Sequence, residues 1–248
     1  MPKDAEAGRL TGKDAVLGVL RSHRVLGSLA GHDLEHLLAF SQLRHFRRRA
    51  QLFVTGHPGA SVYAVLSGYV KLSRANSTGR EIVLELAGPG SLFGELAVIN
   101  GWPRSADAVA LSDCRALAID GRHYMDALRR NPEAMLATIR HLSERLTATT
   151  SQMEDALFLP APARVARALI RLAAQHSQPT GDGLQIDIAI SQRELGDITG
   201  LARESINKQL AVWRDERIIR LDGQHVTLTN AAALQQVANR VGDAAAAA

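Results

Sequence analysis

A stretch near the middle of the chain carries residue types that can hold a phosphorylated sugar. It reads GPGSLFGELAVINGWPRSADAVA. Gly94 precedes what we expect to be a short helical turn, whose unpaired N–H groups can bind a phosphate. Glu95 offers two acceptor oxygens that suit a ribose hydroxyl, and Arg104, beyond a Gly-Trp-Pro bend, can pair with the phosphate charge. With the hydroxyl of Ser105, these residues predict a cyclic nucleotide site.

Other interpretations of this stretch are weaker. GPGSLFG is one residue too long for the G-x-G-x-x-G dinucleotide fingerprint, and no βαβ pattern surrounds it. A surface loop with an incidental Glu–Arg pair would show the same residues, and the stretch alone leaves that alternative open. The sequence has no H-E-x-x-H or G-x-S-x-G motif, and one Glu and one Arg around a phosphate supply no nucleophile. We therefore expect a binding protein rather than an enzyme.

A second stretch with recognisable chemistry reads ISQRELGDITGLARESINKQLAVWRDERIIRLDGQHVTL. Ser191 and Glu194 form a capping box that starts a helix, and Gly200 ends that helix in a tight turn. A second helix follows from about residue 202 to Arg214. Two helices joined by a short glycine-containing turn are typical of the helix-turn-helix of DNA-binding proteins.

The second of these helices has two faces. Ile206, Leu210 and Trp213 recur at helical spacing and should pack inward. The polar face lies near the N-terminal end, where an Arg can grip guanine and a Glu can accept from cytosine. A solvated face held by a Glu204–Lys208 ion pair is the alternative, and the helix alone leaves it open. The DNA-contacting residues that we expect are Ser191, Gln192, Arg203, Glu204, Ser205, Asn207 and Lys208.

The residues after that helix favour DNA binding. Asp222-Gly223 stands between two short apolar runs and predicts a β-hairpin with a type I′ turn. A hairpin directly after a recognition helix makes a winged helix-turn-helix. Arg214, Arg217 and Arg220 lie nearby in the sequence and could meet phosphates.

A long helix that begins at Pro132 precedes this region. Apolar or small residues recur along it at alternating spacings of four and three, which is a heptad seam. A narrow seam flanked by charges favours a two-stranded coiled coil, and hence a homodimer, over a helix packed on its own domain. The helix ends at LFLPAPA, because Pro160 and Pro162 cannot continue it. The seam consists of Met135, Ile139, Leu142, Leu146, Thr149, Met153 and Ala156, and its flanking charges are Arg140, Glu144, Arg145, Glu154 and Asp155.

The region between about Leu52 and Ile119 shows the pattern of antiparallel β-structure. Short apolar runs alternate with turns rich in Gly and Pro, which predicts a roll or barrel. We expect a helix over 29–40 before it, a helix over 163–175 after the prolines, and a loop over 176–183. The expected strands are Val62–Leu66, Tyr69–Leu72, Ile82–Leu86, Ala108–Leu111 and Ala116–Ile119.

These elements predict an α+β fold in three parts. An antiparallel β-roll over 19–131 would bind the ligand, a dimerisation helix would cover 132–159, and a winged helix-turn-helix would cover 160–240. We expect residues 1 to about 18 to form a loosely held arm, and Ala244–Ala248 to be a low-complexity tail.

Composition narrows the possible functions. Apolar residues make up 46% and charged residues 22% of the 248, as in an ordinary globular protein. The single cysteine, Cys114, excludes a disulfide framework and any metal or iron–sulfur site built from the cysteines of one chain. Lys and Arg (29) barely exceed Asp and Glu (25), so a nucleic-acid surface must come from local arrangement. No segment has the length of a membrane span or the apolar core of a signal peptide, so we expect a soluble cytoplasmic protein with no membrane contact.

Two motifs carry a resemblance to the Crp/Fnr family of bacterial transcription regulators, in particular its cyclic-AMP receptor type. FGELAVINGWPRSA and QRELGDITGLARESINKQL occur in the family's order and are joined by a long helix. The resemblance covers about residues 20 to 235. It implies cyclic AMP as an allosteric effector, with cyclic GMP as the second candidate and no metal. It implies that the ligand repositions two helix-turn-helix heads on an inverted-repeat operator of double-stranded DNA, and that RNA polymerase is a partner.

The resemblance also implies roles for individual residues. Glu95 would bind the ribose 2′-hydroxyl, Arg104 the cyclic phosphate, and Arg145 would lie near the ribose end of the ligand. Thr149 and Thr150 stand at a Thr-Ser pair that meets the adenine amino group, one residue from each subunit. The implied ligand-binding set is Gly94, Glu95, Leu96, Ala97, Arg104, Ser105, Arg145, Thr149 and Thr150.

Departures from the family pattern affect both sites. Ala202 stands where many members have a Ser that caps the recognition helix, and Lys208 where the cyclic-AMP receptor type has Arg. An Ala cap forgoes about 1 kcal/mol, and a Lys cannot form the bidentate guanine contact of an Arg. Ser105, in place of a Thr, favours adenine over guanine by analogy with the family.

Alternatives within the family follow from the same residues. Iron–sulfur sensing is excluded because it needs several cysteines. A haem-based gas sensor, with Pro2, His45 or His57 as ligands, stays open, as does a regulator that binds DNA without a ligand.

Overall fold

The computed structural model describes residues 13–239, which form two compact units. The first unit contains residues 13–74 and 85–146, and the second contains residues 75–84 and 147–239. The predicted tail at Ala244–Ala248 and the proposed haem ligand Pro2 lie outside the described residues. Both units combine helices with antiparallel strands, so the predicted α+β class is confirmed.

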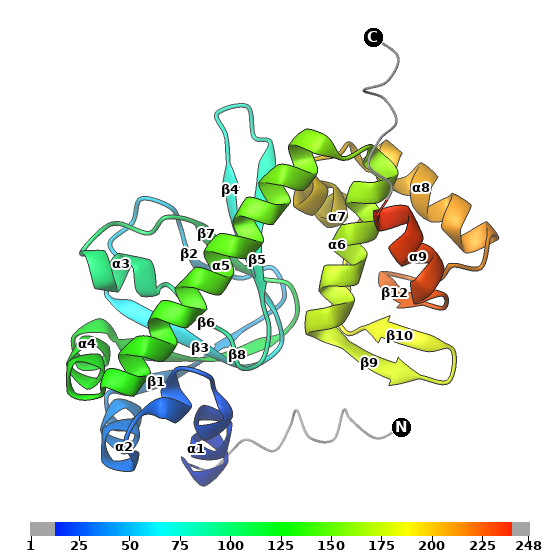
Figure 1. Cartoon of the computed structure of the whole chain (residues 1–248). Helices are drawn as coiled ribbons and strands as arrows, with labels where there is room; N and C mark the ends of the chain where they lie inside the picture. Colours follow the sequence, from blue (N-terminus) through cyan, green and yellow to red (C-terminus); the bar gives the residue numbers. More distant parts are fainter. Residues whose placement is uncertain (1–12, 240–248) are drawn as a thin grey trace. The chain divides into compact units, whose positions relative to one another are not determined.

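Two antiparallel sheets of four strands form the roll of the first unit (Figure 1). Their strand orders are β1-β8-β3-β6 and β2-β7-β4-β5. Buried side chains from both sheets, including Val65, Val70, Phe93 and Ala108, make one core cluster. The strands are β1 (Ser41–Phe46), β2 (Gln51–Phe53), β3 (Ser61–Ser67), β4 (Val70–Ala75), β5 (Glu81–Ala87), β6 (Leu92–Phe93), β7 (Asp107–Ala110) and β8 (Cys114–Asp120).

The five strands expected from apolar runs are all present, with ends shifted by one to three residues. Three further strands, β1, β2 and β6, were not expected. β1 is largely exposed and its sequence, SQLRHF, contains no apolar run. β2 and β6 have three and two residues, which is too short for any alternation to show.

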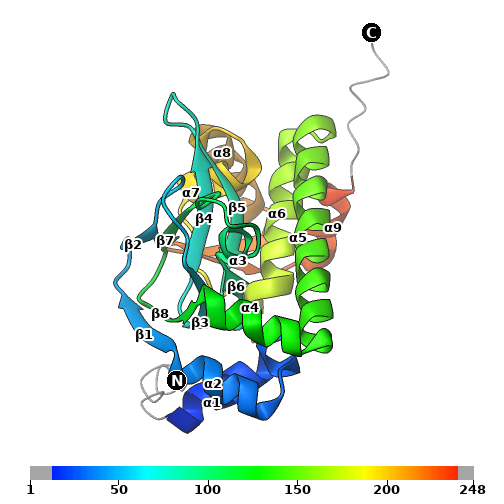
Figure 2. The same cartoon turned by 90° about the vertical axis from the view of Figure 1, so that its left-hand side faces the viewer.

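Helices cover the outer face of the β1-β8-β3-β6 sheet. α1 (Lys13–Ser22), α2 (Gly31–Ala39) and α4 (Gly121–Arg130) lie together (Figure 2), with the short helix η1 (Leu26–Ser28) between the first two. Their core cluster includes Leu20. The expected loose arm over residues 1–18 is therefore wrong from Lys13 onward, because the apolar residues of this segment recur at helical spacing and are buried.

Helix α5 (Pro132–Phe158) is continuous, as the sequence predicts. Proline suits its first turn, where an N–H would have no partner. The heptad seam lies open in the single chain: Ile139, Leu146 and Met153 are 54%, 69% and 59% exposed. Asp155, one of the charges expected to flank the seam, is buried.

The second unit holds the remaining elements. α6 (Ala161–His176) packs along α9 (Ala231–Ala238), as Figure 1 shows. Leu169, Trp213 and Leu234 are among its buried residues. A sheet of order β11-β12-β10-β9 completes the unit. The other elements are β9 (Ser177–Thr180), β10 (Gly183–Ile186), α7 (Gln192–Thr199), α8 (Arg203–Asp215), β11 (Ile219–Asp222) and β12 (His225–Leu228).

Two details of the second unit differ from expectation. The expected loop over 176–183 contains strand β9, a polar SQPT segment whose pairing with β10 the sequence does not reveal. The wing hairpin forms, but Asp222 pairs with His225, so the loop residues are Gly223 and Gln224. Gly223 has φ +58° and Gln224 does not have a positive φ. The predicted type I′ turn is therefore wrong, because it requires positive φ at both loop residues.

Candidate ligand-binding and DNA-binding sites

Arg104 is buried in the roll, where backbone carbonyls and aromatic rings hold its guanidinium group. Its Nη1 donates to the carbonyl of Gly94 at 2.9 Å, and its Nη2 donates to the carbonyl of Ser61 at 2.8 Å. The guanidinium carbon lies 4.3 Å from the ring centroid of Phe53 and 5.7 Å from that of Tyr63. Burial lowers the pKa of Arg104, while nearby Glu95 raises it. The result is a desolvated cation with a fixed orientation, and Nε has no hydrogen-bond partner among the described residues.

Glycines bring the backbone close to this cation. Gly94 is the N-cap of α3 (Glu95–Asn100) and has φ +83°, a left-handed conformation that glycine adopts readily. A Cβ at Gly94 would lie 2.6 Å from Arg104 Nη1. A Cβ at Gly59 would lie 2.5 Å from the Cβ of Ala97 and 3.0 Å from Arg104 Nε. No side chain larger than glycine fits either position without moving Arg104 or α3.

Glu95 opens α3 and its side chain has no solvent exposure. One carboxylate oxygen, Oε1, accepts from Nη1 of Arg145 at 2.5 Å. The other, Oε2, is buried without a hydrogen-bond partner in the described part of the chain. A buried carboxylate oxygen without a donor costs folding free energy. A ligand hydroxyl or N–H that donates to Oε2 would remove this cost.

Glu85 belongs to this site although sequence reasoning missed it. Its Oε2 lies 2.9 Å from Nε of Arg145, which therefore bridges two carboxylates. The sequence of β5 contains a feature that marks this residue, because Glu85 shares a strand face with buried Val83 and Ala87. An acid between two inward-facing apolar residues could have marked the position.

The structure brings part of the implied ligand set together. Gly94, Glu95, Arg104 and Arg145 are linked by the contacts above. Of the rest, Ala97 is buried, Leu96 is half-buried and Ser105 is exposed. Thr149 and Thr150 are exposed on α5 and belong to the second unit.

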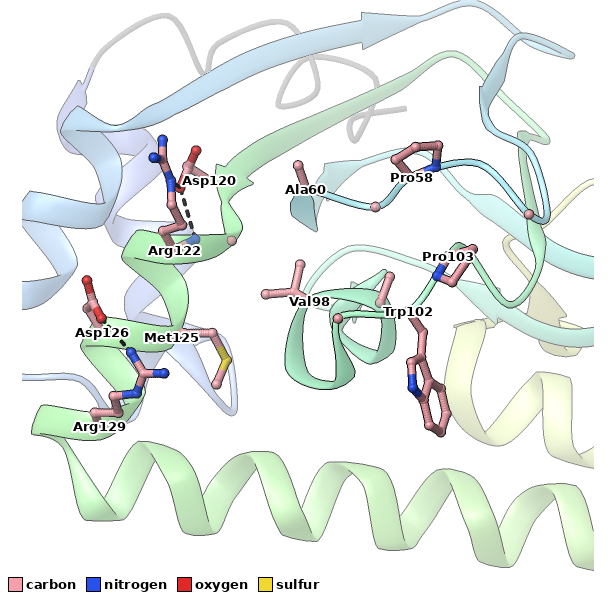
Figure 3. Close-up of a pocket in the computed structure, with 15 residues that line it drawn as sticks. Pro58, Ala60, Val98, Trp102, Pro103, Asp120, Arg122, Met125, Asp126 and Arg129 are labelled. Carbon is pink, nitrogen blue, oxygen red and sulfur yellow. Dashed lines mark hydrogen bonds and ion pairs between the residues drawn. The ribbon is translucent and has the colours of Figure 1, made fainter.

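A cavity of about 870 Å³ lies beside α3 and α4 (Figure 3). Its lining is largely apolar and includes Pro58, Val98, Trp102 and Met125. Neither Glu95 nor Arg104 lines it, but Gly59 and Ala97 do, so it adjoins the site above. Two Asp–Arg pairs of α4 and its N-cap also line this cavity, Asp120–Arg122 and Asp126–Arg129.

The helix-turn-helix is built as its sequence predicts. Ser191 Oγ accepts from the N–H of Glu194 at 3.2 Å, and Glu194 Oε2 accepts from the N–H of Ser191 at 2.7 Å. Gly200 ends α7 with φ +67°. Ala202 is the N-cap of α8 and provides no side-chain cap, as expected from its type.

The N-terminal part of α8 presents an exposed polar face. Ile206, on the opposite face, is buried with Leu210 and Trp213. Gln192 Nε2 donates to Asn207 Oδ1 at 3.2 Å, which ties α7 to this face. Glu204 and Lys208 form no ion pair within the described chain. The alternative of a solvated helix face held by this pair therefore lacks the contact that it needs. The exposed residues of the predicted set are Arg203, Glu204, Ser205, Asn207 and Lys208.

The arginines after α8 differ in their contacts. Arg214 pairs with Asp215 at 2.9 Å, and Arg220 pairs with Asp182. Arg217 is exposed and has φ +58°, in the left-handed region. Arg217 lies between α8 and β11.

Family models match both parts of the chain. A cyclic nucleotide-binding domain matches residues 43–131, and a Crp-like helix-turn-helix domain matches residues 163–237. None of the helices in the described residues is both long and apolar enough to cross a membrane.

Named relatives agree with these models. A CRP-like cAMP-activated global transcriptional regulator of Mycobacterium tuberculosis is 32% identical over 185 residues, 75% of this chain and 83% of the relative. The cyclic AMP receptor protein of Thermus thermophilus is 32% identical over 210 residues, 85% of this chain and 94% of the relative. The crystal structure of a CRP-family transcriptional regulator of Thermus thermophilus superposes with a TM-score of 0.68 at 27% identity, covering 80% of this chain and 97% of that one.

These matches cover both the roll and the helix-turn-helix domain of one chain. They confirm a ligand-responsive regulator that binds DNA through a helix-turn-helix, and the matched family is one of regulators rather than enzymes. The chain belongs to the Crp/Fnr family of transcription regulators.

Proposed function

We propose that this chain is a cyclic-AMP-dependent transcription regulator that acts as a homodimer on operator DNA in the cytoplasm. The observation that carries the proposal is the buried Oε2 of Glu95, which has no partner among the described residues. A ribose hydroxyl is a donor of the right kind for this oxygen. The M. tuberculosis relative is named as cAMP-activated, which supports the choice of nucleotide.

The phosphate side of the site is organised around Arg104. Its guanidinium is fixed against two carbonyls and an aromatic ring, so it needs little reordering to receive an anion. The N–H groups of Leu96 and Ala97 stand in the first turn of α3, where helical N–H groups lack intrahelical acceptors. With the hydroxyl of exposed Ser105, these groups would surround a cyclic phosphate.

The adenine base of the ligand would contact α5, the proposed dimerisation helix. Thr149 lies in the heptad seam and Thr150 beside it, so one ligand can meet residues of both subunits. Hydroxyls can accept from the adenine amino group. We place cyclic GMP second, because Ser105 stands where a Thr would serve guanine.

Homodimerisation is proposed from the exposed seam of α5. Ile139, Leu146 and Met153 would leave water in a parallel coiled coil, which is favourable for apolar side chains. The proposed parts are the β-roll over 19–131, the dimerisation helix over 132–159 and the DNA-binding domain over 160–240. A dimer places two α8 helices about a two-fold axis, so the operator is an inverted repeat with half-sites about 10 base pairs apart. RNA polymerase is the proposed protein partner.

Calorimetric titration tests the ligand. Cyclic AMP should bind with a stoichiometry of one per chain, and cyclic GMP more weakly. Arg104→Ala should weaken binding by at least about a hundredfold, since the phosphate loses its buried counter-charge, while Arg122→Ala, at an exposed position of α4, should not. Cyclic di-GMP is the third nucleotide to titrate, because a Xanthomonas campestris regulator with a TM-score of 0.68 and 25% identity is described as c-di-GMP-responsive. Unchanged affinity in Arg104→Ala would refute the proposed site.

The alternatives give different signals. A haem-based sensor would show a Soret absorbance after addition of haem, and His45 and His57 are the described candidates for its ligand. Both histidines are exposed rather than lining an apolar pocket, which disfavours this function. A ligand-independent regulator would bind operator DNA but no cyclic nucleotide.

A further inference from the structure

Two carboxylates share one guanidinium at the centre of the proposed nucleotide site. Arg145 of α5 contacts Glu85 of β5 through Nε at 2.9 Å and Glu95 of α3 through Nη1 at 2.5 Å. The side chains of Glu85 and Arg145 are 19% and 26% exposed, and that of Glu95 is fully buried. Glu85 is therefore a largely buried acid whose only described ion-pair partner is shared with a more buried one.

The surroundings disfavour the charge on Glu85. Burial raises the pKa of its carboxyl group, and the charge of Glu95 adds to this effect. Arg145 and His141, both on α5, act in the opposite direction, and the net result is a raised pKa. Of the two acids, Glu85 is the one that can be neutralised without loss of a ligand contact.

A bound cyclic phosphate would change this balance. In the described chain the site holds two guanidinium groups, of Arg104 and Arg145, and two carboxylates, of Glu85 and Glu95. These charges cancel. A cyclic nucleotide brings one further negative charge into a poorly solvated site, and one proton on Glu85 would restore neutrality.

We propose that Glu85 takes up a proton from solvent when a cyclic nucleotide binds, so that pH tunes the affinity of this regulator for its effector. The inference rests on the proposed function of the same site. The only bond formed is the O–H of the Glu85 carboxyl group. Glu85 is more readily protonated in the complex than in the free protein. Binding therefore tightens as pH falls from the range where Glu85 titrates in the complex to the range where it titrates in the free protein, and the affinity is constant outside this interval.

The test is a calorimetric titration with cyclic AMP from pH 8 to pH 5.5. The affinity of the unmodified protein should rise by about fivefold or more, within the limit of tenfold per pH unit that one proton sets. Glu85→Gln keeps the size and an acceptor for Arg145 but cannot titrate, so its affinity should change less than about twofold. The matched control is Glu35→Gln, on an exposed position of α2, which should keep the full pH dependence.

A second measurement needs no variant. At a pH within the steep range, the observed binding enthalpy in buffers of different ionisation enthalpy should give an uptake of a fraction of a proton per nucleotide. Zero uptake across the pH range, or equal pH dependence in Glu85→Gln and the unmodified protein, overturns the inference and leaves the proposed function standing. Absence of cyclic AMP binding at every pH overturns both.

Discussion

Replacing Asp155 by Asn should destabilise the second unit more than any surface substitution. Asp155 stands near the end of α5, and its side chain is only 5% exposed. Its two oxygens accept from Arg167 at 2.7 Å and from Arg171 at 2.5 Å, both on α6. This carboxylate therefore joins the two helices across the segment that contains Pro160.

The expected loss is about 2–3 kcal/mol in the free energy of unfolding. Breaking a fully buried ion pair costs about 3–5 kcal/mol. Arg167 and Arg171 are 39% and 30% exposed, so water replaces part of what the carboxylate provided, and the figure must be reduced. An Asn can still accept one hydrogen bond, which reduces it further.

Urea unfolding followed by tryptophan fluorescence measures this loss. Trp213 is buried in the second unit, whereas Trp102 is 64% exposed in the first, so Trp213 dominates the change. The matched control is Asp215→Asn, which removes an exposed pair with Arg214 at 2.9 Å and should cost less than about 0.5 kcal/mol. Equal stability of the two variants would refute the view that Asp155 holds α5 to α6.

Three further predictions test other parts of the molecule. Ala202→Ser should raise the stability of the second unit by about 1 kcal/mol in urea unfolding, because the N-cap of α8 gains a side-chain acceptor; no gain would mean that the hydroxyl does not reach the helix. Arg203→Ala should cost about 1–3 kcal/mol of operator affinity and relax preference at one base pair in binding-site selection; an unchanged selected motif would show that α8 does not read that base. Burial lowers the pKa of His23 from 6.5 to about 4, so the unfolded chain binds its proton first and stability falls as pH drops from about 6.5 to about 4. The loss at pH 4 should be about 3 kcal/mol at most and should be smaller in His23→Gln; equal slopes in both proteins would contradict it.

The sequence allowed most helices and the inner strands to be predicted, because their apolar residues follow the period of the element. α7 and α8 follow from a capping box, a turn glycine and the spacing of Ile206, Leu210 and Trp213. β1 does not follow, since its residues are mostly exposed and its place is set by pairing with β8. The wing turn was placed one residue early, because the register of a hairpin depends on pairing as well as on the Asp-Gly signal.

The residues of the candidate site also divide into those that the sequence predicts and those that it does not. Glu95 and Arg104 were expected because both lie in one motif, and the structure places both in one buried region of the roll. Glu85 and Ser61 were missed because their roles arise only when separate strands meet Arg145 and Arg104. Asp155 was expected only as a charge flanking the heptad seam, because nothing in its local sequence shows that two arginines of the next helix will contact it.

The central claim is that cyclic AMP controls DNA binding, and operator affinity with and without the nucleotide tests it most directly. Fluorescence anisotropy with a selected inverted-repeat duplex at fixed salt gives the dissociation constant in both conditions. Cyclic AMP should tighten operator binding by about tenfold or more, and by linkage the operator should tighten cyclic AMP by the same factor. Glu95→Gln, which weakens the acceptor of the ribose hydroxyl, should need more nucleotide for the same effect. Equal operator affinity with and without saturating cyclic AMP would contradict the account.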